Sequence, residues 1–247
     1  MSKAERFIFN VPRYSLAIVF LLFGIDKFVG YDRYVAWFTV TERSQVIIPS
    51  HEIGQFVYVL GIAELILAGL LLSGFIKRAT TIVTSAALVT ILLVAQYPSS
   101  FPQDLGLLGI SVALTLSSSK GKVLTIEQLG KLAKIIRGAL CVVLVLWSID
   151  QIINTSAHVS WLQLFSPVTR SLTTDQIFAF IISIAVIELV IVVFVASGRL
   201  PKYSYIAAAV FFALVMTLEP PLNGFQSVGL AIVSSWLAYL TLAKKRA

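Results

Sequence analysis

Long apolar segments recur along this chain, and they restrict its fold more than any other feature of the sequence. Each approaches the ~20 residues that an α-helix needs to cross the hydrocarbon core of a bilayer. Short stretches with charged residues, Pro or Gly separate them. Because the bilayer core offers no water to backbone polar groups, such segments cross it as helices. The sequence predicts eight spans, at about 14–30, 54–75, 80–97, 104–117, 138–153, 176–197, 203–218 and 225–243.

Composition and charge agree with a membrane location. The 247 residues are 58% hydrophobic and 13% charged, whereas a soluble domain is charged at roughly a quarter of its positions. All but four of the 19 lysines and arginines lie on the same side as the N-terminus. The positive-inside rule then predicts a multi-pass plasma membrane protein with both termini in the cytoplasm. The net charge of +7 therefore indicates no nucleic-acid partner. The basic residues expected to anchor the topology or contact lipid include Arg13, Arg137, Lys131 and Lys134.

An internal repeat organises the spans. "RYSLAIVFLLFGIDKF" aligns with "RGALCVVLVLWSIDQI" at an offset of 124 residues, which pairs Asp26 with Asp150, and the same offset pairs Glu64 with Glu188. Since each unit has an even number of spans, the two units are parallel repeats. We expect an all-α fold of two four-helix bundles side by side. The predicted units are residues 1–119, a cytoplasmic amphipathic linker at 120–136, and a diverged second unit at 137–247.

Two interpretations of the linker remain open. Thr125 and Gln128 have the spacing of a capping box. Apolar residues then recur at helical spacing, with Lys131 and Lys134 on the other side. This pattern fits an amphipathic helix on an anionic membrane surface. A solvated linker explains it equally well.

Carboxylates inside the spans are the first candidates for function. Glu64 and Glu188 fall near the middle of their spans, where a charge costs about 2.5–3.5 kcal/mol on insertion scales. Each side chain should therefore face the bundle interior and either find a partner or be neutral. Glu64 shares its helical face with Gly61 and Ala68, small residues that let another helix approach closely. A proton relay and a structural hydrogen bond both remain open for these glutamates.

Asp26 and Lys27 lie near the outer end of the first span. The long lysine stem can reach the membrane interface while the aspartate stays deeper. The second unit has Gln151 where the first has Lys27 but retains Asp150, so the carboxylate is the shared feature. We expect Asp26 to make a structural hydrogen bond or to belong to an outer polar site.

Several cofactor classes lack their usual residues. The two histidines, His51 and His158, fall in outer loops and are expected to be solvated rather than to ligate haem. The single Cys141 forms no C-x-x-C pair, and the sequence has no Gly-rich nucleotide loop and no cluster of metal ligands. We expect no haem, flavin or metal on this chain.

Four motifs in the first unit carry a resemblance to a known family. "FGIDKF", "GIAELILAGLLLSG", "FPQDLGLLG" and "GKVLTIEQL" resemble the DoxX/DoxD family of small four-span membrane proteins over roughly residues 12–130, and the second unit matches less well. The resemblance implies an integral membrane subunit of a quinone-linked oxidoreductase. It is similar to the DoxD subunit of thiosulfate:quinone oxidoreductase, which passes electrons from thiosulfate to quinone.

From this resemblance we expect Glu64 and Asp26 to relay protons, and Glu188, Asp150 and Lys27 to lie near a bound quinone. The expected partners are other membrane or extracytoplasmic oxidoreductase subunits and lipid. Two other functions stay open. One is a non-catalytic accessory subunit of a larger respiratory complex. The other is a small-solute transporter that uses Glu64 and Glu188 as a midplane pair.

Overall fold

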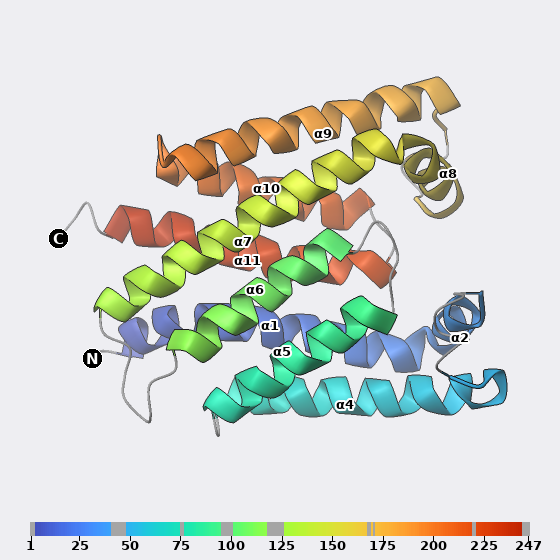
Figure 1. Ribbon diagram of the computed structural model, residues 1–247, viewed down its shortest axis with the longest axis horizontal. Coiled ribbons are helices and arrows are strands. Elements are labelled where there is room, and N and C mark those ends of the chain that lie inside the picture. The colour runs from blue at the N-terminus through green and yellow to red at the C-terminus, as the bar shows by residue number, and fades with distance from the viewer. Residues whose placement is uncertain are drawn as a thin grey trace.

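The computed structural model describes residues 3–40, 48–74, 77–94, 101–117, 126–166, 169, 171–218 and 221–243, and the regular structure within them is helical. Long helices run side by side, and the short helices α2 and α8 lie across one end (Figure 1). The first half contains α1 (Lys3–Val29), α2 (Tyr31–Val40), the 3-10 turn η1 (Ser50–Glu52), α4 (Ile53–Ser73), α5 (Lys77–Val94) and α6 (Phe101–Ser117). The second contains α7 (Ile126–Ile153), α8 (Thr155–Phe165), α9 (Thr174–Ser197), α10 (Pro201–Leu218) and α11 (Pro221–Ala243).

Within the described parts of the chain, eight apolar helices lie where the sequence predicted spans. Six are long and apolar enough to cross a membrane, and they fall in α1, α4, α7, α9, α10 and α11. Two shorter apolar segments, Arg78–Leu93 and Phe101–Ser117, fall in α5 and α6. By helix length and hydropathy, the chain is therefore a multi-pass membrane protein.

The linker does not form a separate surface helix. Residues 126–136 are the first turns of α7, which continues unbroken to Ile153. Leu132 and Ile136 are fully buried, and Lys131 and Lys134 are exposed. The apolar stripe continues in phase into the span, so the same face of one helix packs on the core throughout. The capping residue predicted at position 125 lies outside the described residues.

The two halves, expected from the sequence as two four-helix bundles side by side, share a single core. The last helix of each half also packs on the first helix of the other half, so α6 contacts α7 and α11 contacts α1. One cluster of buried apolar side chains contains residues from the six long apolar helices and from the two shorter ones, α5 and α6. Glycine permits the close approach of α6 and α7, because a methyl group at Gly109 would collide with Ala139.

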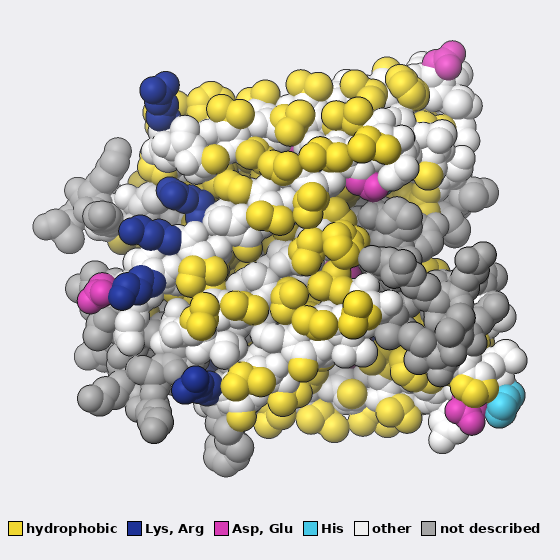
Figure 2. All heavy atoms as spheres, in the orientation of Figure 1, with side chains coloured by type: hydrophobic (Ala, Val, Ile, Leu, Met, Phe, Trp, Pro, Cys, Tyr) yellow, Lys and Arg dark blue, Asp and Glu magenta, His cyan; other side chains and the backbone are white. Residues whose placement is uncertain are grey.

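Charge is distributed unevenly between the two ends of the molecule. Figure 2 shows apolar side chains over the middle of the visible face and Lys and Arg side chains gathered at the end where both termini lie in Figure 1. The cytoplasmic position of both termini was predicted from this concentration of basic residues on the side of the N-terminus.

Candidate functional site

Lys27 and Glu64 form a buried ion pair between α1 and α4. The Lys27 ammonium donates to both oxygens of Glu64, at 2.8 and 2.7 Å, and each side chain is only 5% exposed. The lysine therefore turns across to the neighbouring helix, and the prediction that it reaches toward the interface is wrong. The reason is the closeness of α4, since a Cβ at Gly61 would lie 3.2 Å from the Cβ of Lys27. The small face predicted around Glu64 makes this approach possible.

Asp26 belongs to the same cluster but points toward α2. Its carboxylate accepts from the Arg33 guanidinium at 2.9 Å and from the Tyr34 hydroxyl at 3.0 Å. Burial raises the pKa of Tyr34, and the nearby Asp26 carboxylate raises it further, so the phenol stays protonated and donates. Two acidic and two basic side chains of the first half are thus paired with one another.

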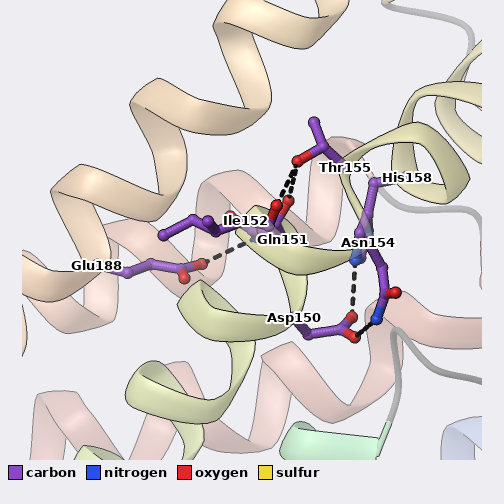
Figure 3. Close-up of polar contacts among 7 residues, drawn as sticks. All are labelled: Asp150, Gln151, Ile152, Asn154, Thr155, His158 and Glu188. Atoms are coloured by element: carbon purple, nitrogen blue, oxygen red, sulfur yellow. Dashed lines mark hydrogen bonds and ion pairs between the residues drawn. The ribbon is translucent and has the colours of Figure 1, made fainter.

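The second half builds an equivalent cluster from different side chains. Glu188 on α9 is fully buried and accepts from Ser148 Oγ at 2.8 Å and from Gln151 Nε2 at 3.2 Å. Figure 3 shows the Glu188 side chain directed toward Gln151 on α7. The partners of this carboxylate are a hydroxyl and an amide, so they supply hydrogen bonds but no positive charge.

Asp150 on α7 is held by α8. It accepts from Asn154 Nδ2 at 2.6 Å and pairs with His158 Nε2 at 2.7 Å (Figure 3). The His158 side chain is only 10% exposed, whereas His51 is 80% exposed. A solvated position is thus wrong for His158, because α8 folds back over the end of α7 and brings the imidazole onto the carboxylate. Sequence position alone could not distinguish the two histidines.

A third polar cluster joins the halves, and no functional motif in the sequence indicated it. Asp104 on α6 is buried and accepts from Gln226 Nε2 of α11 at 3.2 Å. Gln103 Nε2 donates to Ser227 Oγ at the same distance. The two bonds are reciprocal, since an adjacent pair on each helix contacts an adjacent pair on the other. One signal was available in the repeat, where "DLGLLG" from Asp104 aligns with "SVGLAI" from Ser227 at an offset of 123 residues.

Asp104 also adds a third acidic side chain to the cluster of Asp26, Lys27 and Glu64 in the first half. It lies close enough to Lys27 and Glu64 to interact with both electrostatically. Glu64 and Glu188, in contrast, make their hydrogen bonds within their own halves. Among the hydrogen bonds of the described residues none joins the two glutamates, and the midplane pair of a transporter stays a prediction.

The two arginines predicted as topology anchors, Arg13 in α1 and Arg137 in α7, lie beside the C-terminal ends of other helices rather than near the carboxylates. Arg13 is buried, with its guanidinium 5.2 Å from the centre of the Tyr14 ring and against Gly74, which ends α4 at a positive φ of 67°. Arg137 lies near Gly198, which ends α9 at a φ of 65°. Cations at helix C-termini are stabilised by the partial negative charge of the last carbonyls. Their role as topology anchors stays a prediction.

A pocket lies at the end of the second half between α7, α8, α9 and α10. Its volume is about 50 Å³, whereas a single water needs roughly 10–15 Å³ on a comparable measure. Gln151 and His158 line it, and the other lining residues are aromatic or aliphatic: Trp147, Trp161, Leu162, Phe180, Ile181, Ile184, Val215 and Leu218. Among the residues that the structure describes, no group of three or more His, Cys, Asp or Glu side chains could hold a metal ion.

Comparison with known proteins identifies one segment of the chain. The family model described as DoxX matches residues 9–97, which contain the Lys27–Glu64 pair and the Asp26 contacts. No curated protein and no solved structure matches the chain. Because the second half lies outside the matched segment, the division into two repeat units stays a prediction.

Proposed function

Residues 9–97 of this chain form a DoxX domain, and from this premise we propose that the protein is a membrane subunit of a quinone-linked oxidoreductase. The proposal includes eight spans, in two units, in the plasma membrane with both termini in the cytoplasm. One observation carries it. Within the DoxX segment, the buried Lys27–Glu64 ion pair lies next to a second carboxylate. This is Asp26, which accepts from Arg33 of α2. Paired charges at membrane depth are characteristic of proton pathways.

The side chains provide proton-exchanging groups at two depths. Asp26 lies beside the partly exposed Arg33, so protons from the aqueous side can reach it. The Asp26 carboxylate interacts electrostatically with Lys27, which contacts Glu64 directly. Reduction of a quinone to a quinol takes up two protons with two electrons. In this proposal Asp26 and Glu64 deliver the protons. The Lys27 ammonium stabilises the ionised Glu64 carboxylate between transfers.

The electrons come from a partner protein. In the thiosulfate:quinone type of reaction, an extracytoplasmic subunit oxidises the sulfur compound and passes two electrons to the quinone pool. The end that carries α2 and α8 is the surface on which such a subunit would dock (Figure 1). The Lys27 ammonium has a third N–H beyond the two it donates to Glu64, and quinone carbonyls accept from such donors, so Lys27 fits a nearby headgroup.

The test is quinone reduction by the assembled complex in native membranes. Glu64→Gln retains the shape of the side chain but cannot carry the proton, so turnover per assembled complex should fall about 100-fold or more. Glu127→Gln is the matched control, because Glu127 pairs with Lys131 on the exposed surface of α7. Turnover at the wild-type rate in Glu64→Gln would remove the proton-relay function.

A non-catalytic accessory role is the second candidate, and one observation favours it. The four charged groups of the first cluster are already paired with one another, as a purely structural cluster requires. This role predicts that Asp26→Asn lowers the amount of assembled complex, while turnover per complex stays normal. The relay predicts lower turnover per complex for the same variant.

A further inference from the structure

The first half of the molecule shows how this fold holds an ammonium group. The Nζ atom of Lys27 lies 5.1 Å from the centre of the Phe23 ring and 4.7 Å from that of the Tyr34 ring. Glu64 accepts from it on a third side. Two aromatic faces and a carboxylate are the standard surroundings of a recognised organic cation.

The second half retains these surroundings but lacks the cation. At positions 124 residues further on, Trp147 corresponds to Phe23, His158 to Tyr34 and Glu188 to Glu64, while Gln151 stands in place of Lys27. A pocket opens here, and Trp147, Gln151 and His158 line it. Trp161 and Phe180 add two further aromatic side chains.

Gln151 shows what kind of ligand the pocket lacks. The residue is 6% exposed, and its amide nitrogen donates to Glu188, which leaves the amide oxygen on the other side of the group. That oxygen is buried and has no hydrogen-bond partner. A buried acceptor without a partner costs free energy, so a ligand with an N–H or O–H donor would bind there favourably.

Charge narrows the ligand to a cation. Glu188 and Asp150 make their hydrogen bonds to Ser148, Gln151, Asn154 and His158, none of which is a lysine or arginine. In the first half, Lys27 and Arg33 balance the corresponding carboxylates. A cation in this pocket would lie beside two acidic side chains that have no Lys or Arg partner among the described residues, and against aromatic rings whose faces attract positive charge.

We propose that the pocket between α7, α8, α9 and α10 binds a small organic ammonium group, with its N–H donating to Gln151 Oε1 and its charge against the Trp147 and Trp161 rings. The ammonium comes either from a soluble amine or from an ethanolamine lipid headgroup. Because α8 lies across the end of the long helices, the pocket lies at that end of the molecule, where the proposal places the headgroups. The proposal is independent of the quinone-linked function.

The first experiment measures binding of ethylammonium chloride to the purified full chain by saturation-transfer NMR. A ligand of this size binds with a dissociation constant on the order of millimolar. Ethanol is the matched probe, since it has similar size and a donor but no charge. We expect saturation of the ethylammonium signal and little of the ethanol signal. Equal binding of the two probes would overturn the proposal.

Two variants locate the site. Gln151→Lys places in the second half the side chain that fills the first, so its own ammonium should occupy the site and abolish ethylammonium binding. Trp147→Leu retains apolar volume but removes a ring, and should weaken binding about tenfold. If Gln151→Lys does not fold, ethylammonium binding by Trp147→Leu tests the proposal instead. Wild-type binding by folded Gln151→Lys, or by Trp147→Leu, contradicts the proposal.

Lipid composition distinguishes the source of the ammonium. The chain is reconstituted in nanodiscs of phosphatidylglycerol with and without phosphatidylethanolamine, and the lipid retained is measured by native mass spectrometry. Retention of phosphatidylethanolamine that Gln151→Lys abolishes assigns the site to a lipid headgroup. Binding of ethylammonium without such retention assigns it to a soluble amine. Failure of both arms refutes the site.

Discussion

Removal of Lys27 should destabilise the protein far more than removal of the whole ion pair. Lys27→Met leaves the buried Glu64 carboxylate without the ammonium that donates to it at 2.7 and 2.8 Å. Breaking a buried pair in this way costs about 3–5 kcal/mol. At about 2–4 °C per kcal/mol for a chain of this size, the unfolding midpoint should fall by roughly 6–20 °C. The reciprocal variant Glu64→Leu should lose a similar amount, because it leaves the ammonium unpaired.

The double variant Lys27→Met/Glu64→Leu tests the cause. It leaves no unpaired charge, and two apolar side chains of similar volume replace the pair, so it should be more stable than either single variant. The assay is thermal unfolding of the purified protein in detergent, followed by circular dichroism. Glu127→Gln, in the exposed pair with Lys131, is the control and should leave the midpoint unchanged. A double variant that loses the sum of the two single losses would refute the reasoning.

Two further predictions concern the ends of helices. Gly74→Ala should lower stability by about 1–2 kcal/mol because of the left-handed backbone alone, and by more because the new methyl group meets Arg13. Gly69→Ala is the control and should not destabilise, because its added Cβ meets no other atom within 4 Å. Tyr34→Phe should cost roughly 1–2 kcal/mol through the lost hydrogen bond to Asp26. Because the raised pKa keeps Tyr34 protonated, that cost should be constant up to the ordinary tyrosine pKa of about 10 and decline above it. Chemical denaturation in matched detergent and buffers of increasing pH measures both, and a Tyr34→Phe cost that already declines near neutral pH would contradict the second.

The sequence alone determined the features that depend on residues close together in the chain. Apolar length placed the eight helices, and the cost of a charge in the middle of a span placed Glu64 and Glu188 on buried faces. The offset of 124 residues paired Asp26 with Asp150, and each became the centre of a cluster at the end of its helix. These properties are local because a helix has a fixed rise and period, so a short window of sequence is enough to read them.

Only the tertiary structure decided which partner each polar side chain meets. Lys27 has a stem long enough for either the interface or Glu64, and the close packing of α4 on α1 selected Glu64. The contact between Asp104 and Gln226 required α6 and α11 to meet across the two halves, which no local pattern indicates. A hydrogen bond depends on a few tenths of an ångström between helices far apart in the chain, and that distance is set by how whole helix faces pack together.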